Sequence, residues 1–285
     1  MSGAEQDGAR CALPDGTAAP APLRRLRVRY TKTGKIRFTS HRDVVRMWER
    51  ALRRSGVPVA WSEGFSPRPL VSFGLALPTG CESLAEYVDI VLSRSGQSGG
   101  DAWLGETGEP GPQACAALGE RLSALLPQGM DVQVVATLPE GSGSLQQEVS
   151  SCSWDLEVFG LAAEELKSRV ERLLAAPVVL VQRERKGRMA LDDLRPAVLA
   201  LAVAPPPEGG PEDPSTGHRA WLRAEVATRP RGVRPRELLE AIGPGVSLSR
   251  ARRVHQWIER DGARLEPLVG RGDAAIATHA GARAS

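Results

Sequence analysis

Residues 40–56 read SHRDVVRMWERALRRSG, and this stretch decides how the N-terminal half of the chain folds. Ser40 can cap a helix, with Asp43 three residues later, and Gly56 supplies a stop signal. Between these signals the apolar residues recur at helical spacing, at Val44, Val45, Trp48, Ala51 and Leu52. The stretch therefore predicts an amphipathic helix with a single buried stripe.

The same helix carries much of a local excess of positive charge. From Arg24 to Arg68 the chain has eleven Arg and two Lys against three acidic residues, a net charge of +10 in 45 residues of a chain that totals +3. Five arginines, the arginine ridge, fall away from the apolar stripe: Arg42, Arg46, Arg50, Arg53 and Arg54. With Lys35 and Arg37 just before the helix, they predict a surface that contacts the phosphates of RNA. An ordinary solvated helix face is the alternative.

A second basic group contains eight arginines between Arg229 and Arg260, against three glutamates. If the two halves of the chain pack pseudo-symmetrically, both basic groups line one groove. The alternative is that they lie on two unrelated surfaces.

Both halves of the chain show the same order of predicted elements. In the first half, strands are expected at 26–38, 57–61, 70–77, 87–92 and 131–137, and helices at 41–55 and 114–126. In the second half, strands are expected at 154–159, 178–182, 197–204 and 221–227, and helices at 161–174 and 235–242. Residues 252–259 favour a closing strand weakly over a helix. This repetition predicts an α+β fold of two ferredoxin-like (βαββαβ-type) halves with antiparallel sheets.

The composition also suggests where the domains begin and end. We expect a first domain over residues 23–139 and a second over 140–268, between disordered tails at 1–22 and 269–285. Within the domains, 93–112 and 204–217 are rich in Gly, Pro, Ser and Glu and are interpreted as long surface loops.

Several classes of site have no signal in the sequence. The cysteines, at positions 11, 81, 115 and 152, and the histidines, at 41, 218, 255 and 279, show no ligand spacing, so we expect no metal, no iron–sulfur cluster and no cofactor. Isolated cysteines are typically small buried hydrophobic residues. No apolar run approaches the roughly 20 residues that span a bilayer, and a cytoplasmic protein without a membrane partner is expected.

Five motifs carry a family resemblance: FTSHRD (38–43), RALRRSG (50–56), SEGFSPRP (62–69), SFGLALP (72–78) and EYVD (86–89). With these motifs the chain closely resembles the uncharacterised radical-SAM-associated domain family. The resemblance implies a domain that in many bacteria is fused to the C-terminus of a radical SAM protein and in others is a separate chain. The sequence contains no C-x₃-C-x₂-C cluster motif, so the resemblance implies a radical SAM partner that is encoded separately.

The resemblance also implies a connection with RNA. Family members are often encoded beside a ribonuclease of the E/G type, which suggests tRNA or rRNA as a partner. The family has no established catalytic residues, and none can be carried over to this chain.

The loop of residues 62–69 contains an aromatic residue and two prolines that restrict the backbone around Arg68. One interpretation is that Phe65 stacks on a base and Arg68 contacts a phosphate. The other is a structural connection in which Phe65 fills the core. Trp61, just before the loop, is expected to pack inward as part of a strand.

His41 is the weak candidate for a catalytic residue. At a helix N-terminus its pKa would tend to be lowered, and a neutral imidazole could act as a base, with Tyr30 or Lys35 as a helper. A single histidine without a fixed partner is also consistent with helix capping or RNA contact.

These observations favour a non-catalytic accessory protein that binds RNA or presents a substrate to a separate radical SAM enzyme, in RNA modification or processing. The first alternative is a metal-independent ribonuclease that uses His41. The second is a purely protein-binding subunit whose arginines contact an acidic surface of the radical SAM protein.

Overall fold

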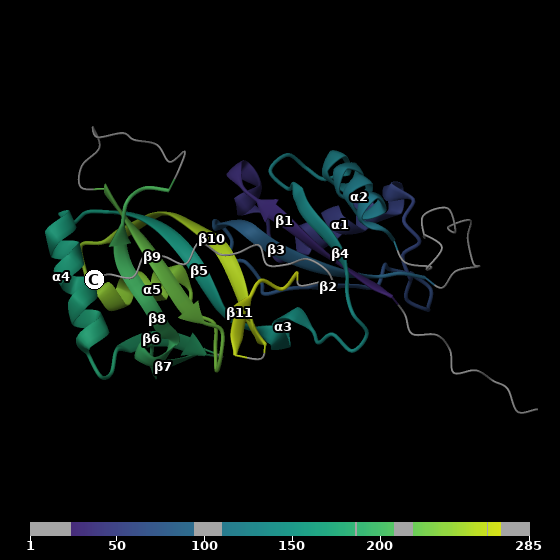
Figure 1. Cartoon of the computed structure of the whole chain (residues 1–285). Helices are drawn as coiled ribbons and strands as arrows, with labels where there is room; N and C mark the ends of the chain where they lie inside the picture. Colours follow the sequence, from purple (N-terminus) through teal and green to yellow (C-terminus); the bar gives the residue numbers. More distant parts are fainter. Residues whose placement is uncertain (1–23, 94–109, 186, 208–218, 261, 269–285) are drawn as a thin grey trace, which may run out of the picture.

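The computed structural model describes residues 24–93, 110–185, 187–207, 219–260 and 262–268. The expected tails at 1–22 and 269–285 lie outside these residues, as do most of the two expected surface loops. Figure 1 shows a long twisted sheet that runs through the molecule, with helices packed against it. The protein is therefore of the α+β class, as the sequence predicts.

The first half forms a βαββαβ unit. Its elements are β1 (Arg25–Lys32), α1 (His41–Ser55), β2 (Val71–Phe73), β3 (Glu82–Val91), α2 (Pro112–Leu125) and β4 (Val132–Thr137). The strands lie in the order β4-β1-β3-β2, and each neighbouring pair is antiparallel. This half is therefore ferredoxin-like.

The second half repeats this pattern. Its elements are β5 (Val149–Phe159), α4 (Ala163–Ala175), β8 (Val198–Ala204), β9 (Arg219–Ala227), α5 (Pro235–Ile242) and β10 (Ser247–Arg260). The strand order is β10-β5-β9-β8, again with antiparallel neighbours. The closing segment 252–259 lies within β10 and is a strand.

Further short elements connect these units. They are the 3₁₀ helices η1 (Gly34–Phe38) and η3 (Arg195–Ala197), α3 (Leu145–Glu148), the hairpin β6 (Leu180–Arg185) and β7 (Arg188–Asp193), and β11 (Ala263–Leu265). The β6–β7 hairpin is inserted between α4 and β8 and forms a two-stranded sheet of its own. The strand expected at 178–182 therefore belongs to an insertion and lies outside the main sheet.

The N-terminal helix α1 begins and ends where the sequence predicts. The Asp43 amide donates to Ser40 Oγ and the Ser40 amide donates to the Asp43 carboxylate, both at 3.3 Å, so a full capping box is present. Gly56 has a left-handed φ of 71° at the C-cap. The core residues of the helix are Val44, Trp48, Ala51 and Leu52.

Two strand expectations in the first half are wrong in detail. The first strand ends at Lys32, because Gly34 has a φ of 68° and the backbone turns into η1. Residues 57–61 make only isolated bridges, Val59 with Leu92 and Trp61 with Pro69. The chain after α1 therefore leads into a loop, and this loop determines where the aromatic residues of the candidate site lie.

The two halves share one sheet because β10, the last strand of the second half, lies beside β3 of the first. These strands run parallel and pair Arg252 with Glu82 and Arg253 with Ser83. The full order is β4-β1-β3-β10-β5-β9-β8. Nothing in the repeat pattern of the sequence predicts this junction.

A buried ion pair crosses the junction. Arg253 on β10 is 2% exposed, and its Nη2 donates to Glu86 Oε1 on β3 at 2.5 Å and to the Leu75 carbonyl at 2.8 Å. Burial opposes the positive charge, but the Glu86 carboxylate offsets this effect, and the pKa of Arg253 is raised above its ordinary value. Gln256 Nε2 also donates across the junction, to the Ala85 carbonyl at 2.5 Å.

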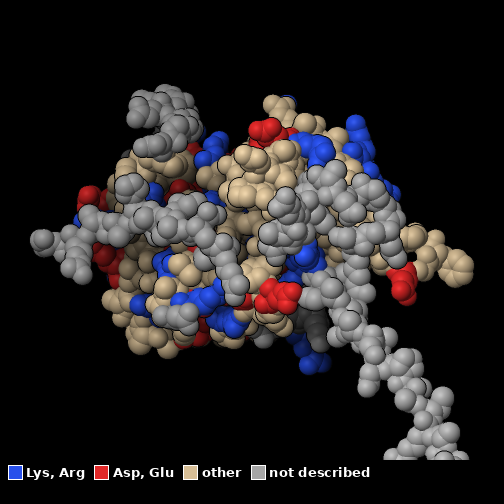
Figure 2. Space-filling model, turned by 45° about the vertical axis from the view of Figure 1, so that its right-hand side comes forward, with Lys and Arg blue, Asp and Glu red and all other residues tan. Residues whose placement is uncertain are grey.

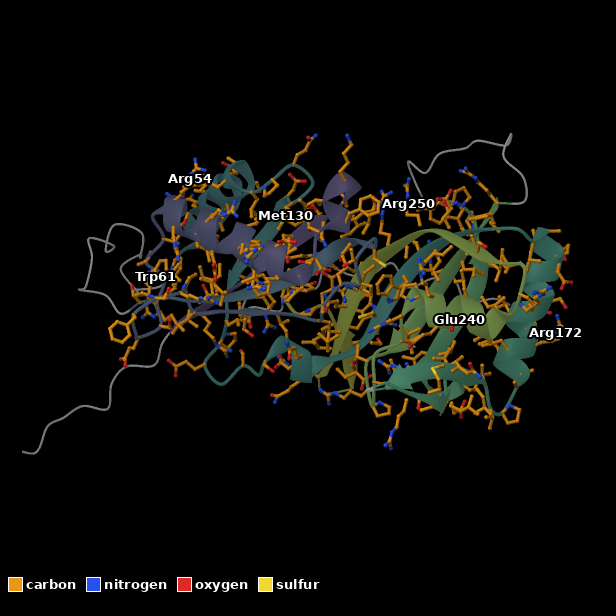
Figure 3. The ribbon with its side chains drawn as sticks, turned by 180° about the vertical axis from the view of Figure 1, so that it is seen from behind. Arg54, Trp61, Met130, Arg172, Glu240 and Arg250 are labelled. Atoms are coloured by element: carbon orange, nitrogen blue, oxygen red, sulfur yellow. The ribbon has the colours of Figure 1, made fainter. Side chains whose placement is uncertain are left out.

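Figure 3 shows that the helices of both halves cover the same face of the sheet. The surroundings of Arg253 and Glu86 agree with this arrangement. Glu86 lines a small cavity together with Val44 of α1. The Arg253 guanidinium lies 5.7 Å from the ring centroid of Trp154, which packs with Leu238 of α5 in the hydrophobic core of the second half. Helices from both halves therefore lie on the same side of the sheet.

We predict that Arg253→Met lowers the free energy of unfolding by about 3–5 kcal/mol, because Glu86 is left buried and unpaired. The double variant Glu86→Leu/Arg253→Met should lose less, since no uncompensated charge remains. Urea denaturation measures both changes.

A matched control is the pair of Arg223 with Asp155, at 3.2 Å, in which the arginine side chain is 62% exposed. Arg223→Met should cost less than about 1 kcal/mol. Equal losses at Arg223 and Arg253 would contradict a special role for the junction.

Candidate nucleic-acid interface

The arginine ridge is an exposed surface of α1. Its five side chains are all exposed and point away from the buried stripe of the helix: Arg42, Arg46, Arg50, Arg53 and Arg54. Asp43 lies 3.8 Å from Arg46, and an exposed pair of this kind neutralises little of the ridge. In the view of Figure 2, Lys and Arg side chains gather at the upper right, over the first half.

An aromatic side chain lies beside the ridge. The Arg53 guanidinium is 5.3 Å from the ring centroid of Trp61, within cation–π distance, and Trp61 is 39% exposed. Figure 3 shows Arg54 and Trp61 at the same end of the molecule. The expectation that Trp61 packs inward is wrong, because residues 57–61 do not form a regular strand that would turn it to the core.

The loop of residues 62–69 projects from this end. The Ser62 amide donates to the Arg68 carbonyl at 2.8 Å, and the Arg68 amide donates to Ser62 Oγ at 3.0 Å, so the base of the loop is closed. Gly64 has a φ of 119° near its tip, and Phe65 is fully exposed. The interpretation that Phe65 fills the core is therefore wrong, and the ring is accessible to a partner.

Part of the local positive charge is used inside the protein. Arg27 and Lys32 are buried, and burial lowers the pKa of Lys32. Arg29 forms an ion pair with Glu266 at 2.6 Å. The net charge of +10 between Arg24 and Arg68 therefore overstates what the surface presents, whereas the ridge itself is exposed.

The two cations that precede the helix have different surroundings. Lys35 is exposed on η1. Arg37 donates to Glu82 Oε1 at 3.2 Å, and its guanidinium lies over the Phe38 ring. Burial would raise the pKa of Glu82, but the hydrogen bond from Arg252 helps to hold it below its ordinary value. Arg37 therefore stabilises the junction, and Lys35 extends the exposed basic surface.

His41 is exposed at the start of α1, and its ring lies edge-on to Phe73, with 5.4 Å between ring centroids. It lines a cavity of about 10 Å³, room for about one water molecule. Tyr30, Lys32 and Glu86 line the same cavity. Burial raises the pKa of Tyr30 well above its ordinary value, so this phenol stays protonated near neutral pH and cannot act as a base beside His41.

Most arginines of the second basic group form ion pairs within the protein. Its internal pairs are Arg231 with Asp192 and Glu237, Arg250 with Glu157, Arg252 with Glu82, Arg253 with Glu86 and Arg260 with Glu148. Arg229, Arg234 and Arg236 are exposed, so the group presents fewer free cations than the ridge on α1.

The EYVD motif at 86–89 has a structural role that sequence reasoning missed. Glu86 binds Arg253, and the Asp89 carboxylate accepts two hydrogen bonds from Arg27, at 2.7 and 2.8 Å. The sequence did carry a sign of this role, because charged residues alternate with apolar ones in and beside the predicted strand at 87–92. The motif secures both faces of β3.

The described cysteines are buried free thiols, as the sequence predicts. Burial raises the pKa of Cys81, Cys115 and Cys152. Within the part of the chain that the structure describes, no three His, Cys, Asp or Glu side chains are grouped so that they could hold a metal ion. In that same part, no helix is both long and apolar enough to cross a membrane.

The chain also has distant likenesses among solved structures. They include a Cbf5–Nop10–Gar1 complex (10% identity, TM-score 0.42, covering 81% of this chain and 48% of the other). A second is an archaeal box H/ACA sRNP Nop10–Cbf5 complex (10% identity, TM-score 0.38, covering 80% of this chain and 46% of the other). A third is an H/ACA RNP bound to a substrate RNA containing 2′-deoxyuridine (9% identity, TM-score 0.39, covering 81% of this chain and 47% of the other). The chain spans about half the length of these proteins, and such distant likenesses carry no functional inference.

Sequence comparison identifies the family. No curated protein matches the chain significantly. The family described as "Uncharacterized protein conserved in bacteria (DUF2344)" matches residues 25–235, from β1 to the start of α5. Because this match covers most of the 285 residues, the protein belongs to the DUF2344 family of bacterial proteins.

Proposed function

We propose that this protein is a non-catalytic accessory protein that works with a separately encoded radical SAM enzyme. It binds RNA, either tRNA or rRNA, or presents a substrate to that enzyme. The observation that carries the RNA part is the exposed arginine ridge of α1, next to the exposed rings of Trp61 and Phe65. Cationic side chains that follow a backbone, with aromatic rings beside them, are the two components of single-strand binding.

The geometry favours binding over cleavage. Binding needs only the cationic and aromatic surface, whereas metal-independent cleavage also needs a base with a placed partner. His41 is exposed, but Tyr30 is 2% exposed beneath α1. RNA that is recovered intact after incubation with the protein would exclude a ribonuclease that uses His41.

The radical SAM partner rests on the resemblance of the five sequence motifs to the radical-SAM-associated domain family. A domain fused to an enzyme in one lineage often contacts that enzyme when the chains are separate, because fusion raises the effective concentration without new contacts. The alternative of a purely protein-binding subunit assigns the arginine ridge to an acidic surface of that enzyme.

We predict that RNA affinity falls steeply with salt, since each neutralised phosphate contributes about 0.7–0.9 to the slope of log K against log salt. Arg46→Glu/Arg50→Glu/Arg53→Glu should weaken binding at least tenfold and reduce the slope by about 2–3. Filter binding to tRNA and rRNA fragments across a salt series measures both quantities.

The matched control reverses three exposed cations of the second half, Lys167→Glu/Arg172→Glu/Arg188→Glu. It changes the net charge by the same amount and should leave most of the affinity. Similar losses in both triple variants would indicate a non-specific charge effect and exclude the ridge as the site.

We predict that Phe65→Ala weakens RNA binding by about 1–3 kcal/mol, the range for loss of one stacked base. Its thermal stability should not change, because Phe65 is fully exposed. Met189→Ala, at an exposed apolar residue of the second half, is the control. Unchanged affinity in Phe65→Ala would remove the loop from the interface.

We predict that the protein forms a complex with a separately encoded radical SAM protein. Anaerobic co-expression and pull-down, with the cluster intact, measures it. If the ridge variant loses this complex and the wild-type protein binds no RNA, the protein-binding alternative is correct. If no radical SAM protein is recovered while RNA binding persists, the accessory role is wrong and the protein acts on RNA alone.

A further inference from the structure

A cleft lies between α5 and the start of β10. Its volume is about 530 Å³ and it is open to solvent, within the roughly 300–1,000 Å³ of small-ligand sites. Its lining residues are Arg236, Leu239, Glu240, Gly243, Pro244, Val246, Ser247 and Leu248. The walls thus combine apolar side chains with one cation, one carboxylate and one hydroxyl.

The cleft lies on the helix side of the sheet, near the junction of the two halves. Burial raises the pKa of the Cys81 thiol, just before β3, and nearby positive charges, Arg236 among them, partly offset this rise. Next to Cys81, the Gly80 amide donates to the Arg37 carbonyl on η1, at 2.8 Å. In Figure 3, Arg54, Arg250 and Glu240 follow one another from the first half to the second.

The charged groups of the cleft are available to a ligand. Arg236 and Glu240 are exposed, and neither takes part in the ion pairs formed among the described residues. This distinguishes them from the other charged residues of the second half, whose arginines mostly bind carboxylates. A carboxylate can only accept hydrogen bonds, so Glu240 selects a ligand that donates.

We propose that this cleft holds one unstacked base of an RNA strand that lies along the arginine ridge, which rests on the RNA-binding function proposed above. Sequence-specific RNA recognition uses single-stranded bases that are splayed into pockets. The base packs against Val246 and Leu248, and Arg236 contacts the adjoining phosphate. Glu240 accepts a hydrogen bond from the exocyclic amino group of the base, as carboxylates do with cytosine N4.

This arrangement selects cytosine over uracil. The two bases have the same size, but uracil presents a carbonyl oxygen where cytosine presents an amino group. A carbonyl opposite Glu240 leaves two acceptors facing each other, which removes the hydrogen bond and adds repulsion. The ridge, in contrast, contacts phosphates and does not discriminate between the bases.

The test compares binding of rC₁₂ and rU₁₂ oligonucleotides by fluorescence anisotropy at fixed salt. The wild-type protein should prefer rC₁₂ by about tenfold. Glu240→Gln should reduce this preference to less than about threefold, because an amide can donate to uracil as well as accept from cytosine. Glu171→Gln, at an exposed glutamate of α4, is the control and should keep the preference.

The outcomes separate this inference from the proposed function. If rC₁₂ and rU₁₂ bind equally to the wild-type protein and the ridge variant weakens both, RNA binding is correct and the cleft assignment is wrong. A preference that survives Glu240→Gln also overturns the cleft assignment. If neither oligonucleotide binds, both proposals are wrong. A preference lost in Glu240→Gln but kept in the ridge variant supports the cleft as the source of specificity.

Discussion

The buried hydrogen bond between Arg253 and Glu86 is the interaction on which the rest of the structure depends. It joins the last strand of one ferredoxin-like half to a central strand of the other, beside the short parallel pairing of β10 with β3. Both charges are removed from water, and each offsets the cost of burying the other. Separation of the two halves would expose the pair and also remove the Gln256 contact with Ala85. The junction therefore makes two similar units behave as one body.

A consequence of this junction is that the helices of both halves lie on one side of the sheet. The arginine ridge, η1 and the cleft beside α5 all lie on this side of the sheet, and this is the surface that the proposed RNA strand follows. On the opposite face, Arg27 is satisfied by Asp89 and Arg29 by Glu266. These two arginines are structural, as is Arg253 on the helix side, whereas the arginines of α1 are exposed.

The distribution of arginines shows why total charge describes this surface poorly. Arginine forms a rigid fork that suits bidentate pairing with carboxylates, and this makes it as useful inside a protein as on a phosphate-binding surface. In this chain, Arg253 and Arg27 are among the largest fully buried side chains. The arginines of α1 differ because the helix turns them to solvent, and among the described residues their one ion partner is Asp43, 3.8 Å from Arg46. Burial, more than the number of charges, distinguishes a binding surface from an internal network.

The sequence by itself determined the features that depend on near neighbours. Helix α1, its capping box, its Gly56 stop and the exposed arginine face all follow from contacts within a few residues. The repeated order of strands and helices likewise predicted the α+β class and the two ferredoxin-like units. The tertiary structure alone decided which partners met across long separations, such as Glu86 with Arg253, 167 residues apart. It also decided that Lys32 is buried while Phe65 and Trp61 are exposed. The physical reason is that residue type fixes local hydrogen bonds and periodicity, whereas burial depends on which distant strand comes to lie alongside.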